Sequence, residues 1–325
     1  MYEVILYYKF AEIDDTNKFM LTHKRKCVEL GLLGRIYLSV QGVNGTVSGT
    51  PKQIKAYKSY VTSLEGFEDT EFKQDQCDEV PFKKLIVRVR EEIVALKGSI
   101  KVDPGKKPGK YLAPHQWKEV LDSEEEITLL DVRNEYESDI GHFEGAICPE
   151  AENFFDFEKW LDEQKLSKDK KVLMYCTGGI RCEVFSVFME NKGYKDVNQL
   201  HGGIIKYSQE VGDDHYKGKC FVFDDRLTVP IEKNQKEPLT RCVITDVPCD
   251  KYLNCYNPEC NKLFICSEEG AKKHEGCCCA KCMKYERRRP FDPTNIYGPT
   301  RKWYNYHEDK KSNKSTDGDN KTTCS

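Results

Sequence analysis

The decapeptide MYCTGGIRCE, residues 174–183, holds the side chains best suited to chemistry in this sequence. Cys176 ends an apolar run, KVLMY, and is followed by two glycines and an arginine. A short apolar run between charged residues predicts a buried parallel strand, so Cys176 should lie at its carboxyl end, where α/β sheets bind ligands. Inward N–H groups of the glycine turn, and a helix starting near Arg181, would favour the thiolate over the thiol.

We interpret Cys176 as the reactive centre and the residues after it as an active-site loop. Arg181 either orients an anion through its planar guanidinium or braces the loop backbone. Cys182 either forms a disulfide with an oxidised Cys176 or packs as a small residue. The two glycines serve the geometry of the turn rather than the chemistry. The other loop residues are Thr177, Gly178, Gly179, Ile180 and Cys182.

A second group of thiols lies nearer the C-terminus, where eight of the sixteen cysteines fall between Cys249 and Cys282. In a reducing compartment such density indicates metal binding or catalysis rather than disulfides. A Cys-x4-Cys spacing and a Cys-x2-Cys spacing separated by a loop can close a tetrahedral thiolate site for structural zinc, which would supply folding energy to a segment with little core. The alternative is a reduced, metal-free segment. The predicted ligands are Cys255, Cys260, Cys282 and one of Cys277 to Cys279, taken here as Cys278.

Composition limits the remaining function classes. The formal charge of −3 gives no global attraction to nucleic acid or membrane, and neither a signal sequence nor a membrane-spanning run is present. We therefore expect a cytoplasmic protein. A local basic run with aromatic neighbours suits RNA phosphates and bases, or is a solvated face. That run consists of Arg287, Arg288 and Arg289. No Gly-x-Gly-x-x-Gly occurs, so no nucleotide or flavin cofactor is indicated.

The elements that must position these side chains begin with a domain at residues 1–95. Its signals follow the order strand, helix, strand, strand, helix, strand, which is that of a ferredoxin-like split βαβ sandwich. Asn44-Gly45 predicts a hairpin turn because both residues tolerate positive φ; alternatively, Asn44 reaches the thiol loop or an RNA. Thr50 and Gln53 predict a helix opened by a capping box. The expected strands lie at 2–9, 34–40, just after the Asn44-Gly45 turn, and at 85–89, with the first helix at 14–30.

The rest of the chain predicts four further regions. Residues 96–112 are a basic linker rich in glycine and proline. Residues 113–215 alternate short strands with helices, which implies a parallel α/β sheet carrying Cys176. Residues 216–307 form the small Cys-rich segment with its basic run, and residues 308–325 have the composition of a disordered tail.

Cys-x4-Arg after a strand, with DVRNEYESDIGHFEGAI upstream and QLHGGI downstream, resembles a rhodanese-type domain. The resemblance implies that Cys176 heads a six-residue loop and carries persulfide or another oxidised sulfur. It also implies that Asp131 and Arg133 brace the site. The related phosphatases use Cys-x5-Arg, so this spacing argues against a phosphatase.

Over about residues 1–290, the order QGVNGTVSG, VREEIVAL, GKYLAPHQW, CTGGIRCE, GKCFVFDDR and a Cys-rich tail resembles the tRNA uridine hydroxylase family. That resemblance implies oxygen-dependent conversion of the wobble uridine, position 34, to 5-hydroxyuridine. Molecular oxygen would be the co-substrate and tRNA the partner, with no stable protein partner implied. The alternatives are a rhodanese-type sulfurtransferase carrying persulfide on Cys176 and a non-catalytic binding module.

Overall fold

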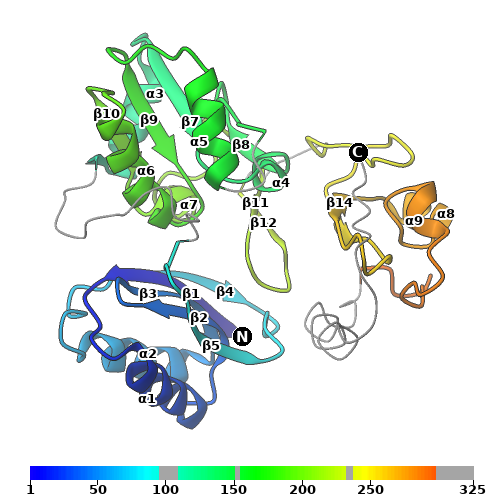
Figure 1. Cartoon of the computed structure of the whole chain (residues 1–325), viewed down its shortest axis with the longest axis horizontal. Helices are drawn as coiled ribbons and strands as arrows, with labels where there is room; N and C mark the ends of the chain where they lie inside the picture. The colour runs from blue at the N-terminus through cyan, green and yellow to red at the C-terminus, as the bar shows by residue number, and fades with distance from the viewer. Residues whose placement is uncertain (95–108, 151–153, 232–236, 298–325) are drawn as a thin grey trace, which may run out of the picture. The chain divides into compact units, whose positions relative to one another are not determined.

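The computed structural model describes residues 1–94, 109–150, 154–231 and 237–297 (Figure 1). The chain divides into two compact units, Met1–Lys233 and Asn234–Ser325, which are called unit 1 and unit 2 below. The predicted disordered tail at 308–325 lies outside the described residues, as does most of the predicted linker at 96–112. The last residues of that linker form a strand, β6 (Lys110–Leu112). Within the described ranges, no helix has both the length and the apolar character needed to cross a membrane.

Unit 1 begins with a split βαβ sandwich, as the sequence predicts. Its sheet has the order β4-β1-β3-β2-β5, and Figure 1 shows both helices on one face of that sheet. The cap of the first helix is Asp15, and the second begins with the predicted capping box of Thr50 and Gln53. The elements are β1 (Tyr2–Phe10), α1 (Thr16–Glu29), β2 (Leu33–Ser39), β3 (Gly42–Gly49), α2 (Pro51–Thr62), β4 (Phe72–Cys77) and β5 (Leu85–Val89).

Two sequence predictions for this domain are wrong in detail. The strand that completes the sandwich is β4, which pairs antiparallel with β1, whereas β5 is an additional edge strand parallel to β2. The polar sequence of β4, FKQDQC, hides it from a pattern search. Asn44 and Gly45 are not a turn: they lie within β3, opposite Tyr8 and Tyr7. A Cβ at Gly45 would lie 2.8 Å from the Tyr7 ring, so glycine is required there for close approach.

The second half of unit 1 holds a parallel four-stranded sheet of order β6-β10-β9-β7, with β9 in its interior. Alternate residues of β7 and β9 face two separate apolar cores, one against α5 and α6 and the other against α3 and α7. The elements are α3 (Pro114–Asp122), β7 (Ile127–Asp131), α4 (Glu135–Ser138), β8 (Gly141–Phe143), α5 (Phe154–Glu163), β9 (Lys171–Tyr175), α6 (Ile180–Asn191), β10 (Val197–Leu200) and α7 (Gly203–Glu210).

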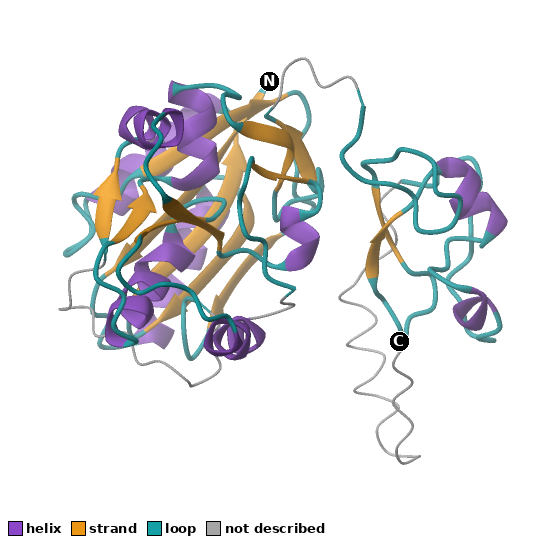
Figure 2. Cartoon of the chain, turned by 90° about the horizontal axis from the view of Figure 1, so that it is seen from above, coloured by secondary structure: helices purple, strands orange, loops and turns teal. Residues whose placement is uncertain are grey.

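Two further strands, β11 (Tyr216–Phe221) and β12 (Thr228–Pro230), join β8 in an antiparallel sheet. Residues 216–230 therefore pair with the α/β domain, although the sequence predicts a new segment from 216. Unit 2 consists mainly of loops, as Figure 2 shows. Its regular elements are β13 (Tyr252–Asn254), β14 (Leu263–Ile265), α8 (Glu268–Lys273) and α9 (Ala280–Met283).

Candidate active site

Cys176 directly follows β9 at the carboxyl edge of the parallel sheet, and its side chain is fully buried. The backbone turns at Gly179, which caps α6 with a φ of 100°. This left-handed conformation favours glycine. The Gly179 N–H donates a hydrogen bond of 3.1 Å to the Cys176 Sγ. The thiol therefore lies in a loop whose N–H donors point inward, as the sequence predicts.

The surroundings of Cys176 favour its thiolate. Burial alone would raise its pKa, but a hydrogen bond from the Cys182 thiol, the Arg181 charge and nearby backbone N–H groups lower it to about 5. The pKa of Cys182 shifts upward, because that thiol is buried and its hydrogen bond to Cys176 requires its proton. The two cysteines thus form an unequal pair in which one sulfur is a thiolate and the other stays a thiol at neutral pH.

Arg181 is held by a carboxylate of the same domain. Its guanidinium makes a bidentate ion pair with Glu137, with distances of 2.6 and 2.7 Å from the nitrogens to the carboxylate oxygens. Glu137 is fully buried and also accepts a 3.4 Å hydrogen bond from the Thr177 hydroxyl. Of the two roles left open for Arg181, this geometry favours bracing the loop. Removing one partner of such a pair leaves a buried charge uncompensated.

Asp131 and Arg133 form a second ion pair of unit 1. Both side chains are fully buried, and the Arg133 Nη2 lies 2.7 Å from the Asp131 Oδ2. The same nitrogen donates to the Gly141 carbonyl at 2.6 Å, which ties the end of β7 to β8. The pair therefore supports the sheet edge from which the thiol loop starts, in line with its expected bracing role.

The start of α7 closes the other side of the loop. The N–H groups of Ile204 and Ile205 donate to the carbonyls of Cys176 and Thr177 at 3.0 and 3.2 Å. A Cβ on Gly203 would lie 2.5 Å from the Cys176 carbonyl oxygen, so the glycine pair of QLHGGI lets α7 approach the loop backbone. The downstream motif is thus a structural part of the thiol site.

The N-terminal sheet covers the thiol loop. The Leu6 Cδ2 lies only 2.3 Å from where a Gly178 Cβ would be, and the Tyr8 hydroxyl lies 3.0 Å from the corresponding position at Gly179. Phe10 packs against the apolar core that includes Cys176. Side chains of β1 therefore line the N-terminal side of the thiol loop.

Glu183 is a site residue that the sequence reasoning missed, although it ends the motif CTGGIRCE. It is 8% exposed and accepts hydrogen bonds of 2.7 Å from the hydroxyls of Tyr8 and Tyr111. Burial raises the pKa of Glu183, although these two hydrogen bonds partly oppose the shift. Glu183 thereby joins β1 and β6 to the first turn of α6. Its position directly after Cys182 in the motif is the sequence feature that could have identified it.

The predicted RNA-contacting residues have different surroundings. The Asn44 Nδ2 donates to the Ile93 carbonyl at 3.2 Å. Arg288 pairs with Glu275 at 2.7 Å, and Arg289 donates to the Cys255 carbonyl at 3.1 Å. Only Arg287 among the three arginines is classed as exposed. The basic run therefore offers Arg287 to a ligand more readily than its neighbours.

The four cysteines predicted as metal ligands come together in unit 2. Among the described residues they are the group whose ligand atoms all lie within 4.8 Å of one another. The Cys260 and Cys278 sulfurs are 3.7 Å apart, and those of Cys278 and Cys282 are 3.8 Å apart. An all-thiolate set at this spacing fits a tetrahedral metal such as zinc. The cluster consists of Cys255, Cys260, Cys278 and Cys282.

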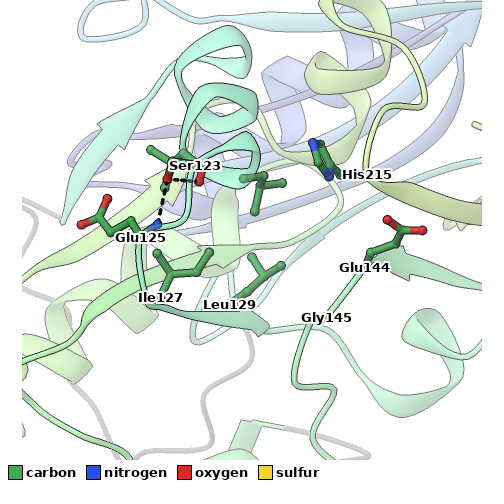
Figure 3. A pocket seen from close by; sticks show the side chains of 9 residues that line it. Ser123, Glu125, Ile127, Leu129, Glu144, Gly145 and His215 are labelled. Atoms are coloured by element: carbon green, nitrogen blue, oxygen red, sulfur yellow. Dashed lines mark hydrogen bonds between the residues drawn. The ribbon is translucent and has the colours of Figure 1, made fainter.

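Figure 3 shows a hollow in unit 1 that is lined by residues before and within β7. Ile127 and Leu129 of β7 line it, whereas Asp131, at the other end of that strand, pairs with Tyr175 beside the thiol. His215 at its rim lies 2.6 Å from the Asp122 carboxylate. The hollow is thus separate from the thiol site.

Three family models match the chain: a UPF0176 acylphosphatase-like domain at residues 2–93, a rhodanese-like domain at 113–210 and a rhodanase C-terminal domain at 217–283. The tRNA uridine(34) hydroxylase of Staphylococcus aureus strain JH9 is 43% identical over 298 residues, which cover 91% of this chain and 93% of that protein. The enzyme of the same name from Bacillus licheniformis is 43% identical over 289 residues, with 88% and 89% covered. The crystal structure of the Alr3790 protein from Anabaena aligns with 33% of this chain and 80% of that chain, with 24% identity and a TM-score of 0.28.

Proposed function

The chain belongs to the tRNA uridine(34) hydroxylase family, and from this premise we propose that it converts the wobble uridine of tRNA to 5-hydroxyuridine with Cys176 as the reacting thiol. The observation that carries the role of Cys176 is its state: a buried sulfur with a pKa of about 5, held by the Gly179 N–H and facing Arg181. Such a sulfur is a nucleophile at neutral pH.

The thiolate activates the base for oxidation. Addition of the Cys176 Sγ to C6 of uracil breaks the C5–C6 π bond and moves its electron pair toward C5 and O4. The resulting carbon at C5 is electron-rich and open to oxidation by molecular oxygen, the co-substrate. Elimination of Cys176 with loss of the C5 proton then restores the aromatic ring. Arg181, Arg133 and Asp131 hold the loop and its sheet edge in place for these steps.

The reaction needs two electrons besides those of the C–H bond. One oxygen atom enters uridine as the hydroxyl group, and the other leaves as water. Two thiols that become one disulfide supply both electrons and both protons, so uridine, oxygen and two thiols give 5-hydroxyuridine, water and a disulfide. Cys182 is the second thiol, because it keeps its proton and hydrogen-bonds to Cys176. A soluble dithiol then reduces the Cys176–Cys182 disulfide by thiol–disulfide exchange before the next turnover.

The remaining parts of the chain are assigned to substrate and stability. tRNA is the partner, with Arg287 as a phosphate contact, and the cytoplasm is the compartment where tRNA is modified. Structural zinc on Cys255, Cys260, Cys278 and Cys282 stabilises unit 2, whose loops surround those sulfurs. The residues for zinc are present, and no catalytic step is assigned to it.

Mass spectrometry of tRNA nucleosides tests the proposal. The gene for this chain is introduced into a bacterial strain that lacks all 5-hydroxyuridine synthesis, and the tRNA nucleosides are compared with those of the empty strain. We expect 5-hydroxyuridine to appear. Absence of this nucleoside, together with thiosulfate-to-cyanide sulfur transfer by the purified protein, would reject hydroxylation in favour of a rhodanese-type sulfurtransferase.

A further inference from the structure

Lys73 lies on the face of the N-terminal sheet that its two helices leave uncovered, the same face that meets the thiol loop. Along β1, Ile5 and Tyr7 belong to the helix-covered core, whereas Leu6 and Tyr8 contact the loop glycines. Lys73 of β4 lies opposite Leu6 in the antiparallel register, so it shares this second face. The position of Lys73 follows from strand pairing and not from any motif of the α/β domain.

Lys73 is unusually enclosed for a lysine, since only 7% of the residue is exposed. Its Nζ lies 4.5 Å from the centre of the Tyr8 ring, a cation–π distance. Burial lowers the pKa of this ammonium, and the charges of Glu71, Cys176 and Glu183 oppose that effect. Burying a charged lysine costs folding free energy. Such a residue is therefore a candidate for a functional role.

The neighbouring carboxylates also have closer partners of their own. Glu71 lies 3.2 Å from the His201 Nε2 and 4.0 Å from the Lys206 Nζ. Glu183 accepts from Tyr8 and Tyr111 at 2.7 Å each. Tyr8 is thus fixed by Glu183 at its hydroxyl while its ring faces Lys73. This arrangement holds the ammonium on the ring of a tyrosine whose hydroxyl lies at the thiol loop.

We propose that Lys73 is a catalytic residue contributed by the N-terminal domain, and that its ammonium binds O4 of the uracil ring when Cys176 adds to C6. This inference rests on the proposed function. The addition forms the S–C6 bond, breaks the C5–C6 π bond and places the electron pair on O4 as an enolate, with no change in oxidation level. A cation at O4 stabilises the charge that develops there, as an oxyanion hole does in acyl transfer.

Lys73 gives the N-terminal domain that lies over the thiol loop a part in the reaction. A sulfurtransferase cycle needs only the cysteine and its loop, whereas addition to uracil creates charge several bonds away from the sulfur. Lys73 supplies the opposite charge on that side, and Tyr8 is its positioning residue through the ring contact and the bond to Glu183.

Three full-length variants, Lys73→Met, Lys73→Arg and Lys9→Met, test this role. Lys9 is the control because it lies on β1 and pairs with Asp69 2.7 Å away at the surface. Two readouts are used: kcat and KM for 5-hydroxyuridine formation on tRNA, and the pH dependence of Cys176 alkylation by iodoacetamide without tRNA. Trypsin cuts at Lys171 and Arg181, so mass spectrometry follows Cys176 and Cys182 in separate peptides.

We expect Lys73→Met to lower kcat by about 10²-fold with little change in KM, because a charge contact of the transition state is lost. The alkylation midpoint of Cys176 should move to higher pH, and Lys73→Arg should recover part of kcat. Lys9→Met should match the wild type. If the wild type makes 5-hydroxyuridine and Lys73→Met does so at the same kcat, the role of Lys73 is rejected and the proposed function stands. An inactive wild type would instead reject the function on which the inference rests.

Discussion

The two cysteine sites of this chain use sulfur in different ways. In unit 1 a single sulfur, Cys176, becomes a thiolate because hydrogen-bond donors and the Arg181 charge surround it. In unit 2 four sulfurs gather within 4.8 Å of one another. Four thiolates at that spacing repel one another unless a cation lies between them, which is the basis of the proposed zinc site.

The surroundings of a cysteine decide whether its sulfur reacts or contributes to stability. In the thiol loop, backbone N–H groups and buried ion pairs, such as Arg181 with Glu137, keep one sulfur reactive. The described part of unit 2 has few regular elements, and we propose that its four clustered sulfurs stabilise the fold by binding zinc. The following changes separate reactivity from stability at the two sites.

The largest effect is expected from removing two ligands of the cluster. The double variant Cys260→Ser, Cys282→Ser should lose zinc and unfold unit 2, because structural zinc contributes on the order of 10 kcal/mol in small domains. Metal analysis and limited proteolysis measure both losses, and Cys176 alkylation should be unchanged. Cys279→Ser is the matched control, because Cys279 directly follows the cluster residue Cys278 but lies outside the cluster. Wild-type protein purified without metal would contradict the zinc assignment.

The second thiol of the loop provides the next contrast. Cys182→Ala removes both the hydrogen bond to Cys176 and the second reducing equivalent, and should lower 5-hydroxyuridine formation by about 10²-fold or more. Cys182→Ser keeps a hydroxyl donor but no thiol, so it separates the two contributions. If the disulfide supplies the electrons, the serine variant fails in turnover while retaining the wild-type alkylation profile of Cys176. Normal turnover by Cys182→Ser would exclude Cys182 as an electron source.

The pH dependence of Cys176 is a smaller and more specific effect. Its folded pKa of about 5 lies below the value of about 8.5 for an unperturbed thiol. Thiolate formation therefore stabilises the folded protein at high pH, and this contribution is lost as the pH falls through about 5. Alkylation of Cys176 should be nearly constant from neutral to mildly alkaline pH and fall about tenfold per unit below the midpoint. A midpoint near that of an ordinary thiol would contradict the activated loop.

The smallest effect is expected at the surface of unit 2. Arg287→Ala should weaken tRNA binding only a few-fold and reduce its salt dependence by about one counterion, because an exposed arginine contributes one phosphate contact. Arg289→Ala should instead destabilise unit 2, since Arg289 donates to Cys255 and Asn261. Filter binding at several salt concentrations measures the first effect. Unchanged binding by Arg287→Ala would remove the basic run from the RNA surface.

Much of the fold follows from local patterns in the sequence. The apolar run before Cys176 predicts its strand, and glycines predict the turn that follows. The errors occur where a contact distant in sequence decides the structure. Asn44-Gly45 has a turn composition, but Gly45 lies in a strand because the Tyr7 ring passes against it. Strand β4 is polar, and only its pairing with β1 places it in the sheet.

The residues of the candidate sites also fall into those that local sequence predicts and those that only the fold brings together. The four clustered cysteines could be chosen from spacing, although Cys278 was one of three adjacent options. Lys73, Tyr8 and Glu183 could not be assembled from sequence, since each comes from a different element and they meet only when β1 lies over the loop. Glu137 lies in the motif DVRNEYESDIGHFEGAI, but nothing in the local sequence predicts that it pairs with Arg181.

The most direct test of the account is to replace Cys176 with alanine in full-length protein and measure 5-hydroxyuridine in tRNA. Cys77→Ala, which changes a half-buried thiol of β4, is the control. We predict that Cys176→Ala folds and binds tRNA but forms no 5-hydroxyuridine, while Cys77→Ala retains wild-type activity. Restoration of 5-hydroxyuridine by the Cys176→Ala protein would contradict the central claim that this thiol carries the reaction.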